Sequence, residues 1–266
     1  MPTCAYCKQE GTLTREHVIP SFLYALQKSS GEKFVGWNEV VGKMVGGEAK
    51  VKDVCAACNN GVLSELDAYG KQVLDEAGLL VHNYLGRSLA LKYEYAPLLR
   101  WSLKVSFNSS RTDGAHSYLF ENFISFILGT AESPSRNRVT LLAYLASPIA
   151  LDEMPAVNQP FGKAAHGAKT LNPFLIRICY GSLPGDDSFI LRINILGPLV
   201  LLMPIFKPDV LPGHAAASIR RIQKMHPGAV ELTGKKRFVE LHAGRSTWLD
   251  MYSDQVRRVR AITGEA

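Results

Sequence analysis

The chain has 266 residues, of which 47% are hydrophobic and 20% are charged, and its net charge is +6. This composition is typical of a folded globular protein and excludes a chain that is disordered over most of its length. Residues 1–67 contain 7 Lys and Arg against 8 Asp and Glu. The positive charge therefore lies in the remainder of the chain. If the partner is a polyanion such as nucleic acid, that remainder must supply much of the attraction for its phosphates.

Two Cys-x-x-Cys pairs lie in the first quarter of the chain, Cys4 with Cys7 and Cys55 with Cys58. A gap of two residues lets both sulfurs of a pair face one ion, and four thiolates satisfy the tetrahedral preference of Zn²⁺. In a reducing compartment, two such pairs favour a structural zinc site over disulfides. A redox dithiol and buried thiols without a metal are the alternatives.

The segment after the first pair predicts a strand over residues 13–19. This strand contains Glu16 and His17, a carboxylate and an imidazole on neighbouring residues. Successive side chains of a strand point to opposite faces. A bulge or a loop is therefore needed to bring both groups to one ion.

The insert before the second cysteine pair, residues 29–50, is rich in glycine and predicts a loop or a loose hairpin. A helix is predicted from about Asn59, because apolar residues recur at helical spacing as far as Ala77. Gly78 follows as a stop signal. Residues 1–77 therefore form one predicted module.

The fold class predicted for the whole chain is α+β. We expect the N-terminal module to be followed by a mixed α/β domain over residues 78–266, with an antiparallel sheet and a C-terminal amphipathic helix. Periodicity and turn signals place helices at residues 98–107, 118–128 and 215–225, and strands at residues 138–146, 174–180, 189–195 and 199–204.

The apolar run over residues 189–206 approaches the length of a membrane span. It contains Arg192, Asn194, Pro198 and Pro204, so a pair of core strands is favoured over a bilayer helix. The N-terminus does not show a basic segment followed by an apolar one. We expect a cytoplasmic protein that does not associate with membranes.

Residues 247–262 have the clearest amphipathic helical pattern in the chain. Thr247 with Asp250 three positions later resembles a capping box. The apolar stripe fits either a contact within the chain or the interface of a homodimer. Three arginines lie mostly off this stripe and are candidate nucleic-acid contacts: Arg257, Arg258 and Arg260.

Together these motifs resemble the HNH nuclease family, which has the ββα-metal fold. The likeness consists of two Cys-x-x-Cys pairs, an acidic residue before His with Pro three positions on, and Asn directly after the last Cys. It is closest to the bacterial branch that has Arg-Glu-His-x-x-Pro, here residues 15–20, and Cys-Asn-Asn-Gly, here residues 58–61. The resemblance covers about the first quarter of the chain.

The resemblance implies a metal-dependent endonuclease that acts on DNA above all. His17 would be the general base that activates water against a phosphodiester. Glu16 and Asn59 would hold a Mg²⁺ or Mn²⁺ ion, which stabilises negative charge on the phosphoryl oxygens. Arg15 would clamp the scissile phosphate, or it is a solvated surface residue.

The sequence departs from the family pattern in two places. The acidic residue is Glu16 where the family more often has Asp, so the metal would sit one methylene farther out. The central Asn that usually precedes the second cysteine pair is missing. Asn38, Asp53 and Asn60 are the alternatives for orienting His17, and the sequence does not choose among them.

A second function is consistent with the same motifs. It is a catalytically silent, zinc-stabilised module that binds nucleic acid or a protein partner, and the missing Asn and the nearly neutral module favour it. It predicts bound zinc without metal-stimulated cleavage. A dithiol oxidoreductase is a third alternative, which tight stoichiometric zinc would exclude.

Overall fold

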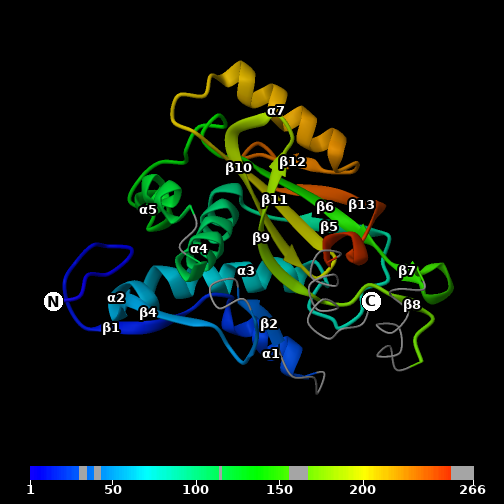
Figure 1. Ribbon diagram of the computed structural model, residues 1–266, viewed down its shortest axis with the longest axis horizontal. Coiled ribbons are helices and arrows are strands. Elements are labelled where there is room, and N and C mark those ends of the chain that lie inside the picture. The colour runs from blue at the N-terminus through cyan, green and yellow to red at the C-terminus, as the bar shows by residue number, and fades with distance from the viewer. Residues whose placement is uncertain (30–34, 39–42, 114–115, 156–166, 253–266) are drawn as a thin grey trace.

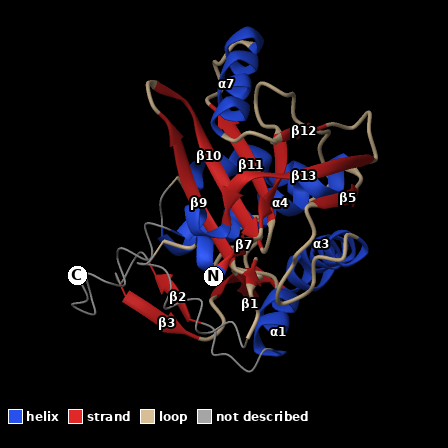
Figure 2. Cartoon of the chain, turned by 90° about the vertical axis from the view of Figure 1, so that its right-hand side faces the viewer, coloured by secondary structure: helices blue, strands red, loops and turns tan. Residues whose placement is uncertain are grey.

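A sheet with helices on both faces organises the protein. The computed structural model describes residues 1–29, 35–38, 43–113, 116–155 and 167–252 (Figures 1 and 2). The N-terminal elements and α4 (Tyr95–Asp113) lie against one face of the main sheet, and α7 (Pro212–Met225) lies on the other. This arrangement agrees with the predicted α+β class.

The main sheet has seven strands in the order β5-β13-β6-β11-β10-β9, with β12 also paired to β6. Its strands are β5 (Ser88–Lys92), β6 (Leu141–Ser147), β9 (Ile176–Leu183), β10 (Asp186–Leu196), β11 (Leu199–Phe206), β12 (Val230–Leu232) and β13 (Phe238–Thr247). Strand β13 runs parallel to β6, whereas the other pairs are antiparallel. The predicted antiparallel sheet is therefore present, with one parallel pair that was not predicted. A parallel pair needs a crossover connection, and α7 lies in the chain between these two strands.

Alternation along the central strands divides the core between the two faces. In β6, Leu141 and Ala143 join the cluster on the α4 side, whereas Leu142 and Tyr144 join the cluster on the α7 side. Both faces are covered, which explains why these strands are apolar throughout. The run over residues 189–206 is the β10–β11 hairpin, as predicted. None of the helices among the described residues is long and apolar enough to cross a membrane.

The N-terminal elements are β1 (Leu13–His17), α1 (Ser21–Ser29), β2 (Val35–Asn38), β3 (Lys43–Gly46), β4 (Lys50–Cys55), α2 (Ala56–Cys58), a π-helical turn (Asn59–Leu63) and α3 (Ser64–Glu76). Strand β1 pairs antiparallel with β4, and β2 pairs with β3, so the glycine-rich insert contains the predicted hairpin. Helix α3 ends as predicted: Gly78 has φ +67°, and its N–H donates to the carbonyl of Asp75 (2.8 Å).

The remaining elements differ from the prediction in extent. Helix α4 continues well beyond residues 98–107 at both ends. Residues 118–128 are a 3₁₀ helix (Ser117–Phe123) followed by α5 (Ile124–Ile127), where one α-helix was predicted. Two short strands, β7 (Ile149–Ala150) and β8 (Thr170–Leu171), pair with each other, with a 3₁₀ turn (Leu151–Glu153) between them. One hydrophobic cluster contains residues of the cysteine knuckles, α3, α4 and the sheet, and the division at residue 77 stays a prediction.

The crossing of α3 and α4 depends on one glycine. A Cβ atom on Gly70 would overlap the indole ring of Trp101, which is fully buried. We expect Gly70→Ala to lower the free energy of unfolding by about 1–3 kcal/mol, because the buried ring has to shift. Gly213→Ala, in the first turn of α7, is the control, since nothing lies within 4 Å of its added Cβ. Urea denaturation compares the two, and equal effects would contradict the close packing.

The turn between β9 and β10 is tied to α7 by Asp186, whose side chain is only 3% exposed. The hydroxyl groups of Ser188 and Ser218 each donate to it at 2.6 Å. Burial raises the pKa of this carboxyl, but these hydrogen bonds outweigh burial and lower the pKa from 3.8 to about 2.

The ionised form of Asp186 therefore stabilises the fold above pH 4, and this contribution is lost as the pH falls through the folded value near 2. We expect Asp186→Asn to destabilise the protein at pH 7 and the difference from the parent to shrink at pH 3. Urea midpoints at the two pH values measure this. Asp187→Asn is the control, because that side chain is 99% exposed. A deficit of constant size at both pH values would contradict the assignment.

The C-terminal helix begins where it was predicted. Residues 248–252 are helical, and the Thr247 N–H donates to Asp250 Oδ2 at 2.7 Å. This is one of the two hydrogen bonds of a capping box, and the Thr247 hydroxyl donates to the same carboxylate oxygen at 3.2 Å. The rest of this predicted helix lies outside the described residues, including Arg257, Arg258 and Arg260, so their role in binding nucleic acid stays a prediction.

Candidate metal centre and active site

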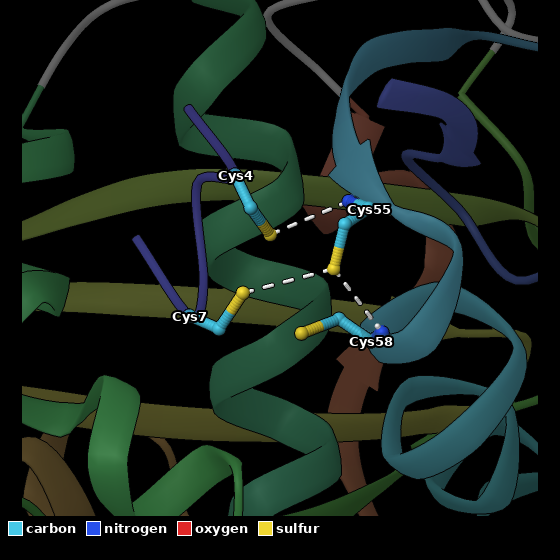
Figure 3. Close-up of side chains that lie close together, drawn as sticks. All are labelled: Cys4, Cys7, Cys55 and Cys58. Atoms are coloured by element: carbon cyan, nitrogen blue, oxygen red, sulfur yellow. Dashed lines mark hydrogen bonds between the residues drawn. The ribbon is translucent and has the colours of Figure 1, made fainter. Parts of the chain in front are cut away.

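The four cysteines of the two knuckles come together at one point. Their sulfur atoms all lie within 4.8 Å of one another, and Cys7 Sγ is 3.6 Å from Cys55 Sγ. Four sulfurs at the usual Zn–S distance of about 2.3 Å would stand about 3.8 Å apart in a tetrahedron. Figure 3 shows the four side chains turned toward a common centre. They are placed to hold a structural metal such as zinc.

Local backbone structure shapes each knuckle. In the first knuckle the N–H of Lys8 donates to the carbonyl of Cys4, and Lys8 has φ +60°, which closes a tight turn. In the second knuckle, α2 begins at Ala56, and the Cys58 N–H lies 3.5 Å from Cys55 Sγ. The N–H of Cys55 lies 3.4 Å from Cys4 Sγ and links the two knuckles. Such backbone donors favour thiolates over thiols.

The pKa values of the thiols shift in opposite directions within the cluster. Burial opposes ionisation of Cys4, but the N–H groups of Cys55, Cys7 and Tyr6 outweigh it and lower its pKa from 9.0 to about 7. For Cys58, burial and the neighbouring sulfurs raise the pKa well above the usual range. Thiols this close together cannot all ionise unless a cation compensates their charge. The donor set therefore fits Zn²⁺.

His17 lies at the end of β1 and contacts a carboxylate of the insert. Its Nε2 is 2.9 Å from Glu48 Oε2, and the two side chains are 25% and 22% exposed. Glu48 also accepts from Lys28 Nζ (2.6 Å) and Lys50 Nζ (2.9 Å). These three donors lower the pKa of Glu48 from 4.5 to about 2, so this carboxylate is ionised at neutral pH.

The Glu16 side chain lies on the opposite side of β1 from His17, in the interface between β1 and α4. Its side chain is 6% exposed, and its Oε1 lies 2.7 Å from Lys104 Nζ. The side-chain amide of Asn108 donates to the same oxygen at 3.1 Å and to the main-chain oxygen of His17 at 2.9 Å. The β1–β4 register does shift between Thr14 and Glu16, yet Glu16 and His17 still have separate partners.

Asn59 joins the start of the helical segment to β1. Its amide nitrogen donates to Thr14 Oγ1 (2.9 Å) and to the main-chain oxygen of Arg15 (3.2 Å). The Arg15 side chain is exposed, which is compatible with both of its predicted roles, and Asn60 is exposed as well. The helix start is therefore held against the strand by an amide that the resemblance assigns to metal binding.

A catalytic divalent cation does not fit Glu16 as it is placed. One carboxylate oxygen of Glu16 already accepts from an ammonium and an amide. Asn59 donates from its amide nitrogen to β1, so its Oδ1 is the atom that could ligate a cation. Within the part of the chain that the structure describes, the four cysteines form the only group of three or more Cys, His, Asp or Glu side chains that could share an ion.

The sequence analysis offered Asn38, Asp53 and Asn60 for orienting His17 and did not consider Glu48. Asp53 instead pairs with Arg111 at 2.6 Å, and the side chain of Asn38 lies outside the described residues. The structure places Glu48 beside the imidazole. Spacing gives no signal for this contact, because Glu48 lies inside the glycine-rich insert, 31 positions after His17.

Comparison of the chain with protein-family models, with curated proteins and with solved structures gave no match.

Proposed function

We propose that the protein hydrolyses phosphodiester bonds in nucleic acid, with DNA as the favoured substrate and His17 as the general base. The observation that carries this proposal is the contact of 2.9 Å between His17 Nε2 and Glu48 Oε2. A carboxylate at Nε2 favours the tautomer with its hydrogen on that nitrogen, which leaves the lone pair of Nδ1 free to accept a proton. The resemblance to HNH nucleases assigns the same role to His17.

The chemistry follows from this pair. Nδ1 takes a proton from water while the water oxygen forms a bond to phosphorus, and the bond from phosphorus to the leaving oxygen breaks. The leaving oxygen takes its proton from solvent. Glu48 stabilises the imidazolium that forms and keeps the ring in place, as carboxylates do beside catalytic histidines.

Positive charge for the phosphate lies close to the base. Lys28 and Lys50 both contact Glu48, and their side chains are 59% and 36% exposed. A phosphate that approaches His17 would meet both ammonium groups, which are point charges well suited to phosphate.

A bound divalent cation would add charge stabilisation on the phosphoryl oxygens. The need for Mg²⁺ or Mn²⁺ stays a prediction of the resemblance, because the carboxylate expected to hold the ion contacts Lys104. Supercoiled plasmid incubated with the purified protein in Mg²⁺, in Mn²⁺ and in EDTA tests the activity. Nicking or linearisation supports the proposal, and intact plasmid under all three conditions counts against it.

A second candidate is the silent zinc-stabilised module that binds nucleic acid or a protein. The burial of Glu16 against α4 favours this candidate. A carboxylate that forms an ion pair with a buried lysine is not available to bind a catalytic metal. It predicts bound zinc and DNA binding that weakens with salt, without cleavage in any cation. The same plasmid samples, with zinc counted, separate the two candidates.

A further inference from the structure

Helix α4 carries a row of polar side chains that is buried against the N-terminal elements. Lys104 is fully buried, and its Nζ lies 2.7 Å from Glu16 Oε1 and 2.7 Å from Asp67 Oδ2. Trp101 Nε1 donates to the other oxygen of Asp67 at 3.2 Å. Asn108, one turn farther on, accepts from the Tyr6 hydroxyl at 2.6 Å. The ammonium is thus enclosed by groups that are themselves fixed.

The charges of Glu16, Asp67 and Lys104 resemble those of a cation site. Two carboxylates face a single ammonium, so the group carries a net charge of −1 when all three are ionised. Burial raises the pKa of Asp67, and the charge of Glu16 acts in the same direction, while Lys104 opposes both. Carboxylate oxygens around a small volume are also the ligands that Mg²⁺ and Mn²⁺ prefer.

An ammonium and a divalent cation cannot both occupy this position. Mg²⁺ binds carboxylate oxygens at about 2.1 Å. Lys104 Nζ is within hydrogen-bonding distance of both carboxylates, so it fills the space between them. A dication there would also face a buried positive charge at close range, which is strongly unfavourable at low dielectric.

We propose that the Lys104 ammonium takes the place of the divalent cation at Glu16, so that Glu16 is a positioning residue that fastens β1 to α4 and does not bind metal. This assignment of Lys104 deepens the proposed function. Its consequence for catalysis rests on that function. Any cation that the cleavage reaction needs is bound elsewhere, and Glu16 acts on the base only by fixing the strand that ends in His17.

The experiment measures Mn²⁺ binding by electron paramagnetic resonance on the zinc-loaded, full-length protein. The parent is compared with Glu16→Gln, with Lys104→Met and with the double variant of both positions. Glu65→Gln, an exposed carboxylate on α3, is the matched control. Melting temperatures of all five proteins are recorded with and without Mn²⁺.

We expect the parent and Glu16→Gln to bind the same amount of Mn²⁺. Glu16→Gln should melt lower by ~3–6 °C, because the charge of a buried ion pair is lost while the amide still accepts hydrogen bonds. Lys104→Met leaves the carboxylates of Glu16 and Asp67 without their shared cation, so it should bind one additional Mn²⁺ and be stabilised by it. The double variant should not gain this ion.

A parent that binds one Mn²⁺ which Glu16→Gln abolishes would overturn the inference. If Lys104→Met does not fold, the comparison of the parent with Glu16→Gln still decides it. Because the readout is metal binding, the result is independent of cleavage. A protein that cuts no plasmid refutes the proposed function, whereas Mn²⁺ bound through Glu16 refutes the assignment of Lys104.

Discussion

Replacing His17 by alanine should reduce plasmid cleavage by at least ~100-fold, because a positioned general base contributes about 10²–10⁴ to the rate. Zinc content and melting temperature should stay close to those of the parent, since the imidazole is partly exposed and its one hydrogen bond is to a carboxylate that two lysines also hold. The measurement is the initial rate of nicking of supercoiled plasmid, with bound zinc counted in the same samples.

His242→Ala is the control for this variant, because His242 is 70% exposed and lies on β13. Its cleavage rate should match that of the parent. Cleavage that survives in His17→Ala would remove His17 as the base. A rate that falls equally in both variants would show a general effect of losing a histidine.

Glu48→Gln refines the same prediction. Glutamine keeps a hydrogen-bond acceptor near His17 Nε2 but loses the negative charge that stabilises the imidazolium. We expect a smaller loss of rate than for His17→Ala, together with an unchanged zinc content. A rate equal to the parent's would show that Glu48 does not position the base.

Loss of the metal at the cysteine cluster should have the largest effect on stability. Zinc binding in small domains contributes roughly 10–16 kcal/mol of apparent folding free energy. Cys4 and Cys58 belong to the same hydrophobic cluster as α4 and the inner face of the sheet. We therefore expect Cys58→Ala, or a strong chelator, to unfold the N-terminal elements and to loosen α4 as well.

Thermal melting followed by circular dichroism and by tryptophan fluorescence measures this, because Trp101 is buried where α3 and α4 meet. Cys179→Ala is the control, since Cys179 lies on β9 outside the knuckles. It should keep one zinc per chain. If Cys58→Ala retained the zinc and the melting temperature of the parent, the cysteine cluster would not be a structural metal site.

The buried polar row of α4 is a feature that the sequence analysis did not predict. Lys104, Asn108 and Arg111 recur at helical spacing, a pattern that ordinarily indicates a solvent-facing side. In the structure they face carboxylates, a hydroxyl and a main-chain oxygen of the N-terminal elements, and Lys104 and Asn108 are fully buried. Periodicity detects which residues share a helix face, but it does not tell what that face packs against.

The sequence alone determined the features that depend on nearby residues. Each cysteine knuckle requires only a two-residue gap, the capping box at Thr247 only three positions, and the β10–β11 hairpin only a short turn between apolar runs. The meeting of the two knuckles followed from the coordination that zinc prefers. These rules are local or chemical, and the structure agrees with them.

Only the tertiary structure decided the partners of the candidate catalytic residues. His17 meets Glu48 from 31 positions away, and Glu16 meets Asn108 from 92 positions away. The parallel pairing of β13 with β6 likewise joins distant residues, with Ala243 opposite Leu145. Such contacts depend on how whole elements pack. A carboxylate can pair with a metal ion, a lysine or water, and the fold determines which of these lies beside it.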